Sequence, residues 1–355
     1  MNFLKNFFSY LFIIFSFSGC NGIKSITPFG IDRISPTYIT QPVVHDTDDP
    51  AIWINPKNAD ASLIIGTDKD SDGKLYAYNL QGQIVATSES LQRPNNVDIV
   101  QSFSFQGEII SLAITTERET NKIRVFKLPE LMAIDNGGIE VFEGEVHRLP
   151  MGIALYQNPE NNRLYAIVGR KDGPAKDYLF QYEIIEKEGF MSANLIRKFG
   201  DYSGKKEIEA IAVDNELGYI YYSDETHGIS KYYADPAKGN EKLAFFGAKD
   251  FKRDMEGISI YKTDEKNGFI IISDQQNNRF NVYRREGEPN NPHQHILIAN
   301  LYLTTNESDG NESMNYYFGP EFPQGIFVAM SDDKTFHIYD WRNLQQSINQ
   351  QINAK

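Results

Sequence analysis

Cysteine is almost absent from this chain of 355 residues, in which Cys20 is the only one. A body that begins after Cys20 can form no internal disulfide, so packing and hydrogen bonds must stabilise it. The same absence excludes catalysis by a cysteine nucleophile. The content of 41% hydrophobic and 13% aromatic residues is that of a globular protein, and the 23 Phe and 20 Tyr favour β structure.

Long hydrophobic runs are missing too, apart from one near the N-terminus. Lys5 precedes a short apolar run at 11–17, and this run is shorter than the ~20 residues of a membrane span. Ser18, Gly19 and Cys20 follow it and resemble the lipobox of bacterial lipoproteins, in which the cysteine is lipidated. The alternative is an ordinary cleaved secretory signal with an incidental cysteine.

We therefore expect an exported protein that is lipid-anchored through Cys20 to a bacterial outer membrane, on its periplasmic or its surface face, rather than a freely secreted one. The lipid would be its only contact with the membrane. Removal of residues 1–20 would take away Lys5 and no acid, so the net charge of −13 would become −14.

Helical periodicity is the third feature that the sequence lacks. From residue 43 onward the chain instead consists of short β-type runs separated by turn residues. Only residues 343–352 show helical periodicity, and a helix is expected there. Six blocks repeat with a period of roughly 50 residues, which is typical of propeller blades. Each block holds a strongly apolar second strand, at 63–66, 109–114, 164–168, 219–222, 269–272 and 325–329. An aromatic third strand follows each of them, at 75–78, 123–126, 179–182, 229–232, 280–283 and 336–339.

The sequence thus predicts an all-β fold, a six-bladed β-propeller preceded by an N-terminal lipoprotein-type signal peptide. The signal peptide is expected to comprise residues 1–20 and the single propeller domain residues 43–355. Residues 21–42 contain Gly, Ser and Pro and are expected to form a tether. A short strand near 37–39 would close the ring by joining the last blade.

Acidic residues gather where strands of this repeat begin and end. Asp46, Asp48 and Asp49 directly precede an apolar strand, and such a cluster is unfavourable unless a positive charge joins it. A solvated Asx-type turn would explain one such cluster. Its repetition favours a cation with oxygen ligands, Ca²⁺ above all. Further polar residues at strand starts are Asn95, Asn96, Asp98, Glu207, Glu209, Asp254 and Glu256.

Basic residues occur at the same phase, directly after second strands. They are Lys69, Arg118, Arg170 and Lys171. The first strands of propeller blades line the central channel, so the repeat predicts that acids and bases of several blades meet near the axis. Such a cluster should raise carboxylate pKa values or bind cations.

Four segments of the chain are similar to the signature segments of β-propeller phytases. They are 46–53 (DTDDPAIW), 95–98 (NNVD), 254–258 (DMEGI) and 319–325 (GPEFPQG). That family consists of six-bladed, calcium-dependent enzymes that remove phosphates from myo-inositol hexakisphosphate, or phytate. The resemblance covers residues 43–342 and implies a phosphoric monoester hydrolase of the 3-phytase type, in which a calcium-bridged water attacks phosphorus.

The resemblance also implies roles for individual residues. It assigns several Ca²⁺ ions to the carboxylates of Asp49, Asp98, Glu209, Glu225, Asp254, Glu256 and Asp309. It assigns substrate phosphate to Lys69, Arg118 and Arg170, and catalysis to Glu225, Asp309 and Lys69. The chain departs from the family pattern at Asp70, which stands where a second lysine is usual, and at Met151, which replaces a tyrosine.

Other phosphatase chemistries find little support in the sequence. His147 lacks the Arg-His-Gly context of histidine acid phosphatases, and only His293 and His295 lie close enough in sequence to suggest zinc. Metal-assisted hydrolysis on oxygen ligands remains. The alternatives are a lactonase-type hydrolase, against which the three basic residues argue, and a non-catalytic surface propeller stabilised by calcium.

The expected partners are phytate or lower inositol phosphates, with no nucleic acid, and the protein is expected to be a monomer.

Overall fold

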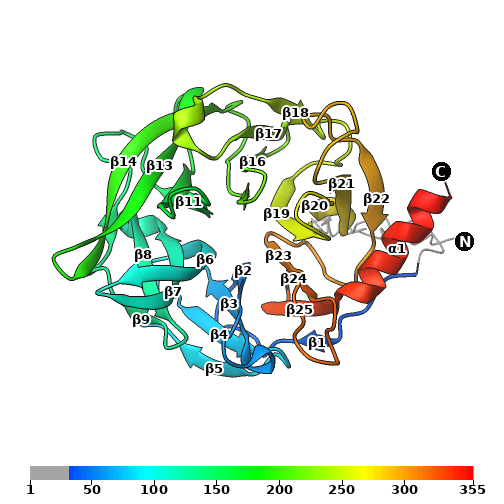
Figure 1. The fold of residues 1–355 in the computed structure, drawn as a ribbon, viewed down its shortest axis with the longest axis horizontal. Helices are drawn as coiled ribbons and strands as arrows, with labels where there is room; N and C mark the ends of the chain where they lie inside the picture. The colour runs from blue at the N-terminus through cyan, green and yellow to red at the C-terminus, as the bar shows by residue number, and fades with distance from the viewer. Residues whose placement is uncertain (1–31, 355) are drawn as a thin grey trace, which may run out of the picture.

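The short apolar runs and turn residues of the sequence fold into a ring of six antiparallel sheets (Figure 1), seen in a computed structural model that describes residues 32–354. The signal peptide, Cys20 and residues 21–31 of the predicted tether lie outside the described residues. Five sheets have four strands and one has five, and each sheet forms one blade of a β-propeller. The predicted all-β six-bladed propeller is confirmed.

The first three blades follow the chain in order. Blade 1 consists of β2 (Thr47–Trp53), β3 (Leu63–Asp68), β4 (Leu75–Asn79) and β5 (Ile84–Thr87). Blade 2 consists of β6 (Pro94–Phe105), β7 (Glu108–Glu117), β8 (Lys122–Leu128), β9 (Met132–Ala133) and β10 (Ile139–Glu140). Blade 3 consists of β11 (Pro150–Gln157), β12 (Leu164–Arg170), β13 (Lys176–Lys187) and β14 (Phe190–Asp201).

The last three blades complete the ring. Blade 4 consists of β15 (Ile211–Asp214), β16 (Tyr219–Asp224), β17 (Gly228–Tyr233) and β18 (Ala244–Phe246). Blade 5 consists of β19 (Met255–Lys262), β20 (Gly268–Asp274), β21 (Arg279–Arg284) and β22 (Leu297–Leu301). Blade 6 consists of β23 (Asn311–Met314), β24 (Ile326–Ser331), β25 (Thr335–Asp340) and β1 (Tyr38–Ile39).

Blade 6 joins the two ends of the described chain. Tyr38 of β1 lies opposite Ile338 of β25, and Ile39 lies opposite His337. The outermost strand of the last blade therefore comes from the start of the propeller, and opening the ring would require this pairing to break.

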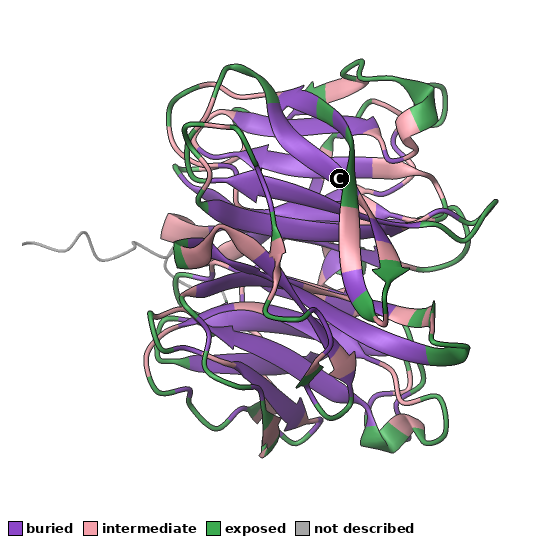
Figure 2. Ribbon diagram, turned by 90° about the vertical axis from the view of Figure 1, so that its left-hand side faces the viewer, coloured by how far each residue is buried: buried purple, intermediate pink, exposed green. Residues whose placement is uncertain are grey.

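The core lies between neighbouring blades. The innermost strands surround the axis (Figure 1), and the buried strand centres form continuous layers with the exposed residues at loops and edges (Figure 2). Between blades 6 and 1, Val328 and Phe336 pack in one cluster with Ile64 and Tyr78. A Cβ at Gly66 would lie 2.2 Å from Phe336 Cε2, so this close approach of two blades requires glycine.

Helix α1 (Trp341–Asn353) begins where the last blade ends. The Asp340 carboxylate accepts a hydrogen bond from the Arg342 N–H at 3.0 Å and caps the first turn. Trp341, Leu344 and Ile348 are buried, and the Trp341 ring stacks on Tyr261 at a centroid distance of 3.4 Å. Within residues 32–354, no helix has the length and apolar character needed to cross a bilayer.

The stacking of Trp341 on Tyr261 provides a test of this packing. We expect Trp341→Ala to lower the free energy of unfolding by about 3–5 kcal/mol, because it removes a buried aromatic side chain and leaves a cavity. Chemical denaturation measures the change. Gln346→Ala on the exposed face of the same helix is the matched control, and equal stabilities for the two variants would contradict the expectation.

Candidate metal and phosphate site

The acids at the blade starts meet at one end of the central channel. Asp48 comes from β2, Glu256 from β19, and Glu209 from the segment before β15. Burial and the charges of Asp48, Asp309 and Glu225 all act on Glu209, so carboxylates of three blades or their connecting loops lie within electrostatic reach of one another. The convergence arises because all first strands start at the same face of the ring.

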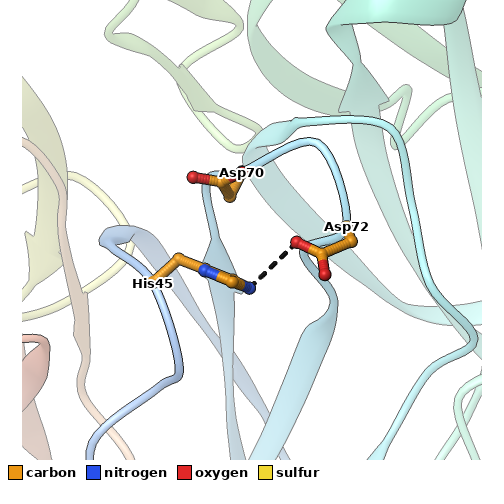
Figure 3. Close-up of side chains that lie close together, drawn as sticks. All are labelled: His45, Asp70 and Asp72. Atoms are coloured by element: carbon orange, nitrogen blue, oxygen red, sulfur yellow. Dashed lines mark ion pairs between the residues drawn. The ribbon is translucent and has the colours of Figure 1, made fainter.

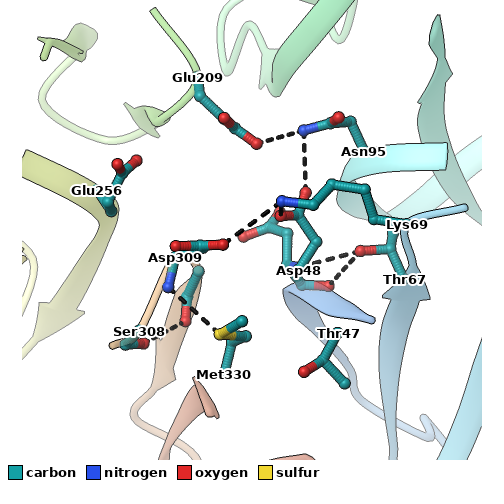
Figure 4. Close-up of polar contacts among 12 residues, drawn as sticks. Thr47, Asp48, Thr67, Lys69, Asn95, Glu209, Glu256, Ser308, Asp309 and Met330 are labelled. Atoms are coloured by element: carbon teal, nitrogen blue, oxygen red, sulfur yellow. Dashed lines mark hydrogen bonds and ion pairs between the residues drawn. The ribbon is translucent and has the colours of Figure 1, made fainter. Parts of the chain in front are cut away.

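Lys69 is the cation on one side of this cluster. Its ammonium contacts the Asp48 carboxylate and lies 3.4 Å from Asp309 Oδ2 (Figure 4). Asn95 Nδ2 donates to Asp48 Oδ2 at 2.9 Å and also contacts Glu209 Oε1. Burial opposes the charge of Lys69, but Asp48, Glu209 and Asp309 outweigh it and raise its pKa well above the usual value. Lys69 and Asn95 thus connect three acids from separate parts of the chain.

Lys206 is the cation on the other side. Its Nζ lies 2.5 Å from Glu225 Oε2, 3.2 Å from Asp254 Oδ2 and 3.7 Å from Glu256 Oε1. Gln276 fixes the orientation of Asp254, because its Nε2 donates to Asp254 Oδ2 and its Oε1 accepts from the Asp254 N–H, both at 2.8 Å. The acidic cluster is therefore shared between two lysines.

The carboxyl groups have raised pKa values because they are buried and close together. Burial, followed by the charge of Asp48, raises the pKa of Glu209 to about 8. Burial also raises the pKa of Glu225 to about 7 and that of Asp309 to about 6. A nearby lysine lowers the pKa in both cases, but burial outweighs it. The pKa of Glu256 is raised well above its usual value by burial and then by the charges of Glu225, Asp309 and Glu209.

Two groups of acids in this cluster could hold a metal ion. Glu207, Glu209 and Glu225 form one, Glu225, Asp254 and Glu256 form the other, and within each group the ligand oxygens lie within 4.8 Å of one another. Glu225 Oε1 and Asp254 Oδ1 are buried and accept no hydrogen bond from the described residues. An all-oxygen donor set with unused buried carboxylate oxygens fits Ca²⁺.

Asp49 and Asp98 lie deeper in the channel. Both line a cavity of about 530 Å³ that residues of all six first strands surround. The Val97 N–H donates to Asp49 Oδ2 at 3.1 Å, and the Leu155 N–H donates to Asp98 Oδ2 at 2.7 Å. Each carboxylate therefore also ties its own blade to the next one. Burial raises the pKa of Asp98 to about 6.

Arg118 belongs to the cluster as the resemblance implies, since its Nη2 contacts Asn95 Oδ1. The charges of Glu209 and Asp48 act on it, although burial dominates and lowers its pKa. Its Nε is buried and donates no hydrogen bond to any described residue. Arg118 thus keeps a donor free beside the carboxylates.

Arg170 contacts a different set of residues. Its side chain is 1% exposed, Nη1 donates to Glu145 Oε2 at 3.2 Å and to the His147 carbonyl at 3.0 Å, and its guanidinium packs against the Phe142 ring. The structure does not bring this side chain among the central carboxylates. Its contacts are those of a buried arginine that stabilises blade 3.

Several residues of the site were not predicted from the sequence. Lys206 is the most important, and its position five residues before β15, close to Glu207 and Glu209, could have indicated it. Glu312 was missed because a single acid in the short, mostly polar strand β23 gives no sequence signal. It lines the channel cavity, and burial followed by the charge of Asp98 raises its pKa to about 8.

A third group of possible ligands lies on the β3–β4 hairpin and the segment before β2. His45, Asp70 and Asp72 could place ligand atoms within 4.8 Å of one another, and His45 Nε2 pairs with Asp72 Oδ1 at 3.0 Å (Figure 3). The Asp72 side chain is 73% exposed. Because this pair is open to solvent and already closed on itself, we assign no ion to it.

The raised carboxyl pKa values predict how stability depends on pH in the metal-free protein. The pKa of Glu209 is 4.5 in the unfolded chain and is raised to about 8 by burial in the folded protein, so the folded state binds more protons in that window. Stability must then fall as pH rises from about 4.5 to about 8. We expect thermal melts in chelator to show this fall and Ca²⁺ to suppress it, because the ion stabilises the ionised carboxylates.

The control for this pH dependence is Glu209→Gln, which removes one of the titrating groups. Its melting temperature in chelator should depend less steeply on pH than that of the unmodified protein. A melting temperature that rises with pH across the same window in chelator would contradict the assignment.

Comparison with known proteins places this site in a family. The chain matches the model of the phytase family over residues 31–353. It is 28% identical over 328 residues to a 3-phytase of Bacillus subtilis (strain 168), which covers 85% of this chain and 81% of that relative.

Solved structures agree with the fold. The structure of BBS1N in complex with ARL6DN, soaked with mercury, matches this chain with a TM-score of 0.50 at 12% identity. The matched region covers 84% of this chain and 79% of that chain. At that identity the likeness concerns the fold alone. The family match, by contrast, spans every blade that contributes a carboxylate or a lysine to the site. The chain belongs to the phytase family.

Proposed function

We propose that the protein is a calcium-dependent phosphoric monoester hydrolase that releases phosphate from phytate and lower inositol phosphates. One observation carries this proposal: buried carboxylates with unused oxygens lie beside three cationic side chains at the mouth of the channel. Membership of the phytase family and the similarity to a 3-phytase support the substrate.

The residues fit calcium and phosphate in separate roles. Glu207, Glu209, Glu225, Asp254 and Glu256 would hold Ca²⁺. Bound Ca²⁺ supplies positive charge for phosphate oxygens and lowers the pKa of a coordinated water. Lys69 and the Arg118 guanidinium would bind phosphate oxygens, with the arginine fork suited to two of them. Glu225 Oε1, which is buried and has no hydrogen bond from the described residues, would accept a proton.

Charge explains why both cations and calcium are needed. The chain carries a net charge of −13, and a polyanion such as phytate would be repelled by it. Ca²⁺, Lys69 and Arg118 would reverse the sign locally. A lactonase has no comparable need for Lys69 and Arg118, and a propeller that used calcium only for stability would not need both cations beside the carboxylates.

The location of the protein is a separate proposal. We infer from the leader-like residues 1–20 that it is exported, and from the lipobox-like Ser18, Gly19 and Cys20 that a lipid on Cys20 anchors it to the outer membrane. These residues lie outside the described part of the chain, so the sequence alone supports the proposal. We further propose that the protein acts as a monomer.

The calcium requirement can be tested by phosphate release from phytate. We expect release by the purified mature protein with Ca²⁺, and loss of release in excess chelator that is restored by Ca²⁺, because the carboxylates alone repel the substrate. Absence of release at saturating Ca²⁺ would eliminate the phytate assignment. Phosphate release that persists in chelator would support phytate as the substrate but contradict the proposed role of calcium.

Two arginines separate phosphate binding from structural support. We expect Arg118→Ala to lower kcat/KM for phytate by about 10- to 100-fold, from the loss of charge-assisted hydrogen bonds to phosphate. Its free energy of unfolding in Ca²⁺ should change by less than about 1 kcal/mol. Arg170→Ala should instead lower that free energy by about 2–4 kcal/mol, since it removes a buried side chain that packs on Phe142 and donates to the His147 carbonyl.

Activity per folded molecule of Arg170→Ala should stay near that of the unmodified protein. Steady-state kinetics and denaturation of both variants measure the two effects. Loss of turnover in Arg170→Ala without loss of stability would return Arg170 to the phosphate-binding residues that the resemblance implies.

A further inference from the structure

Lys206, which the sequence analysis did not single out, has its ammonium group among three carboxylates of the central cluster. It lies in the segment that leads into β15, and its Nζ contacts carboxylates that come from two other parts of the chain: Glu225 after β16, and Asp254 and Glu256 at the start of β19. All three contacts are within 4.0 Å, so one ammonium group is the shared counter-ion of three buried acids.

The same three carboxylates form one of the two central groups that could hold a metal ion. The Lys206 ammonium and a divalent cation would use the same oxygens, and like charges at that distance repel strongly. Lys69 does not compete in this way, because its ion-pair partners, Asp48 and Asp309, belong to neither group. Lysine and metal are therefore alternative occupants of the Glu225–Asp254–Glu256 site.

The contacts of the site indicate which member can move. The Glu225 side chain is 1% exposed and Asp254 is held by the Gln276 amide on two atoms. The Lys206 side chain is 36% exposed and carries its charge on a flexible four-carbon stem. The carboxylates are thus fixed, while the lysine can turn outward to solvent without disturbing them.

We infer that Lys206 is an internal counter-ion that holds the Glu225–Asp254–Glu256 site together in the metal-free protein and is displaced when Ca²⁺ binds. The inference rests on the calcium dependence proposed above. It explains how a buried acidic site stays folded without metal. It also makes calcium binding an exchange of one cation for another, which raises the calcium concentration needed to fill the site.

Lys206→Met tests the exchange, because methionine keeps much of the side-chain volume and removes the charge. Lys205→Met is the matched control, since it removes the same charge one residue away, where Lys205 faces His227 rather than the carboxylates. Calcium titration by calorimetry and thermal melts in chelator and in saturating Ca²⁺ are measured for both variants and the unmodified protein.

We expect Lys206→Met to bind Ca²⁺ more tightly than either other protein. The gain should be about tenfold if Lys206 occupies the site in about nine-tenths of the metal-free molecules. Its melting temperature in chelator should lie several degrees below that of Lys205→Met, because three buried carboxylates lose their counter-ion, and the gap should close in saturating Ca²⁺. Unchanged calcium affinity in Lys206→Met, or equal melting of the two variants in chelator, would overturn the exchange. An unmodified protein that binds no Ca²⁺ would overturn the proposed calcium dependence as well, so the two failures are distinguishable.

Discussion

Repulsion among buried carboxylates at the axis of the ring is the constraint on which the rest of this structure depends. Glu209, Glu225 and Glu256 are buried close to one another. Burial is the largest cause of the raised pKa of each. Such an arrangement costs stability unless cations compensate it. Lys69 and Lys206 do so in the protein alone, and divalent cations would do so more completely.

The propeller tolerates this cost because its stability comes from elsewhere. The apolar clusters lie between blades, as with Ile64 and Phe336, and the pairing of β1 with β25 closes the ring. The acids at the strand starts are thus held in place by packing to which they contribute little. Asp49 and Asp98 are exceptions, since their carboxylates bond the backbone of the next blade and so connect the site to the ring.

The blades could be predicted from the sequence because their signal is local and repeated. The predicted second strand at 63–66 lies within β3 and the predicted third strand at 75–78 within β4, and the later blades follow the same pattern. The helix predicted at 343–352 begins two residues earlier, where Asp340 caps it. The convergence of acids near the axis followed from the same repeat, because equivalent positions of successive blades share a face.

The partners of individual side chains could not be predicted in this way. Arg170 has the same phase as Lys69 and Arg118, yet its guanidinium is directed to Glu145 and His147, which lie in a loop without a repeated pattern. Lys206 lies five residues before the first strand of its blade. No other blade has a lysine or arginine at the corresponding position. A repeat specifies backbone phase, whereas the direction of a long flexible side chain depends on packing that differs from blade to blade.

The position of the divalent cation tests the central claim most directly. A crystal structure of the protein grown with Ca²⁺ should show an ion with Glu225, Asp254 and Glu256 oxygens at about 2.3–2.6 Å, and the Lys206 ammonium turned away from them. Carboxylates that still hold Lys206 and no ion at saturating Ca²⁺ would contradict it.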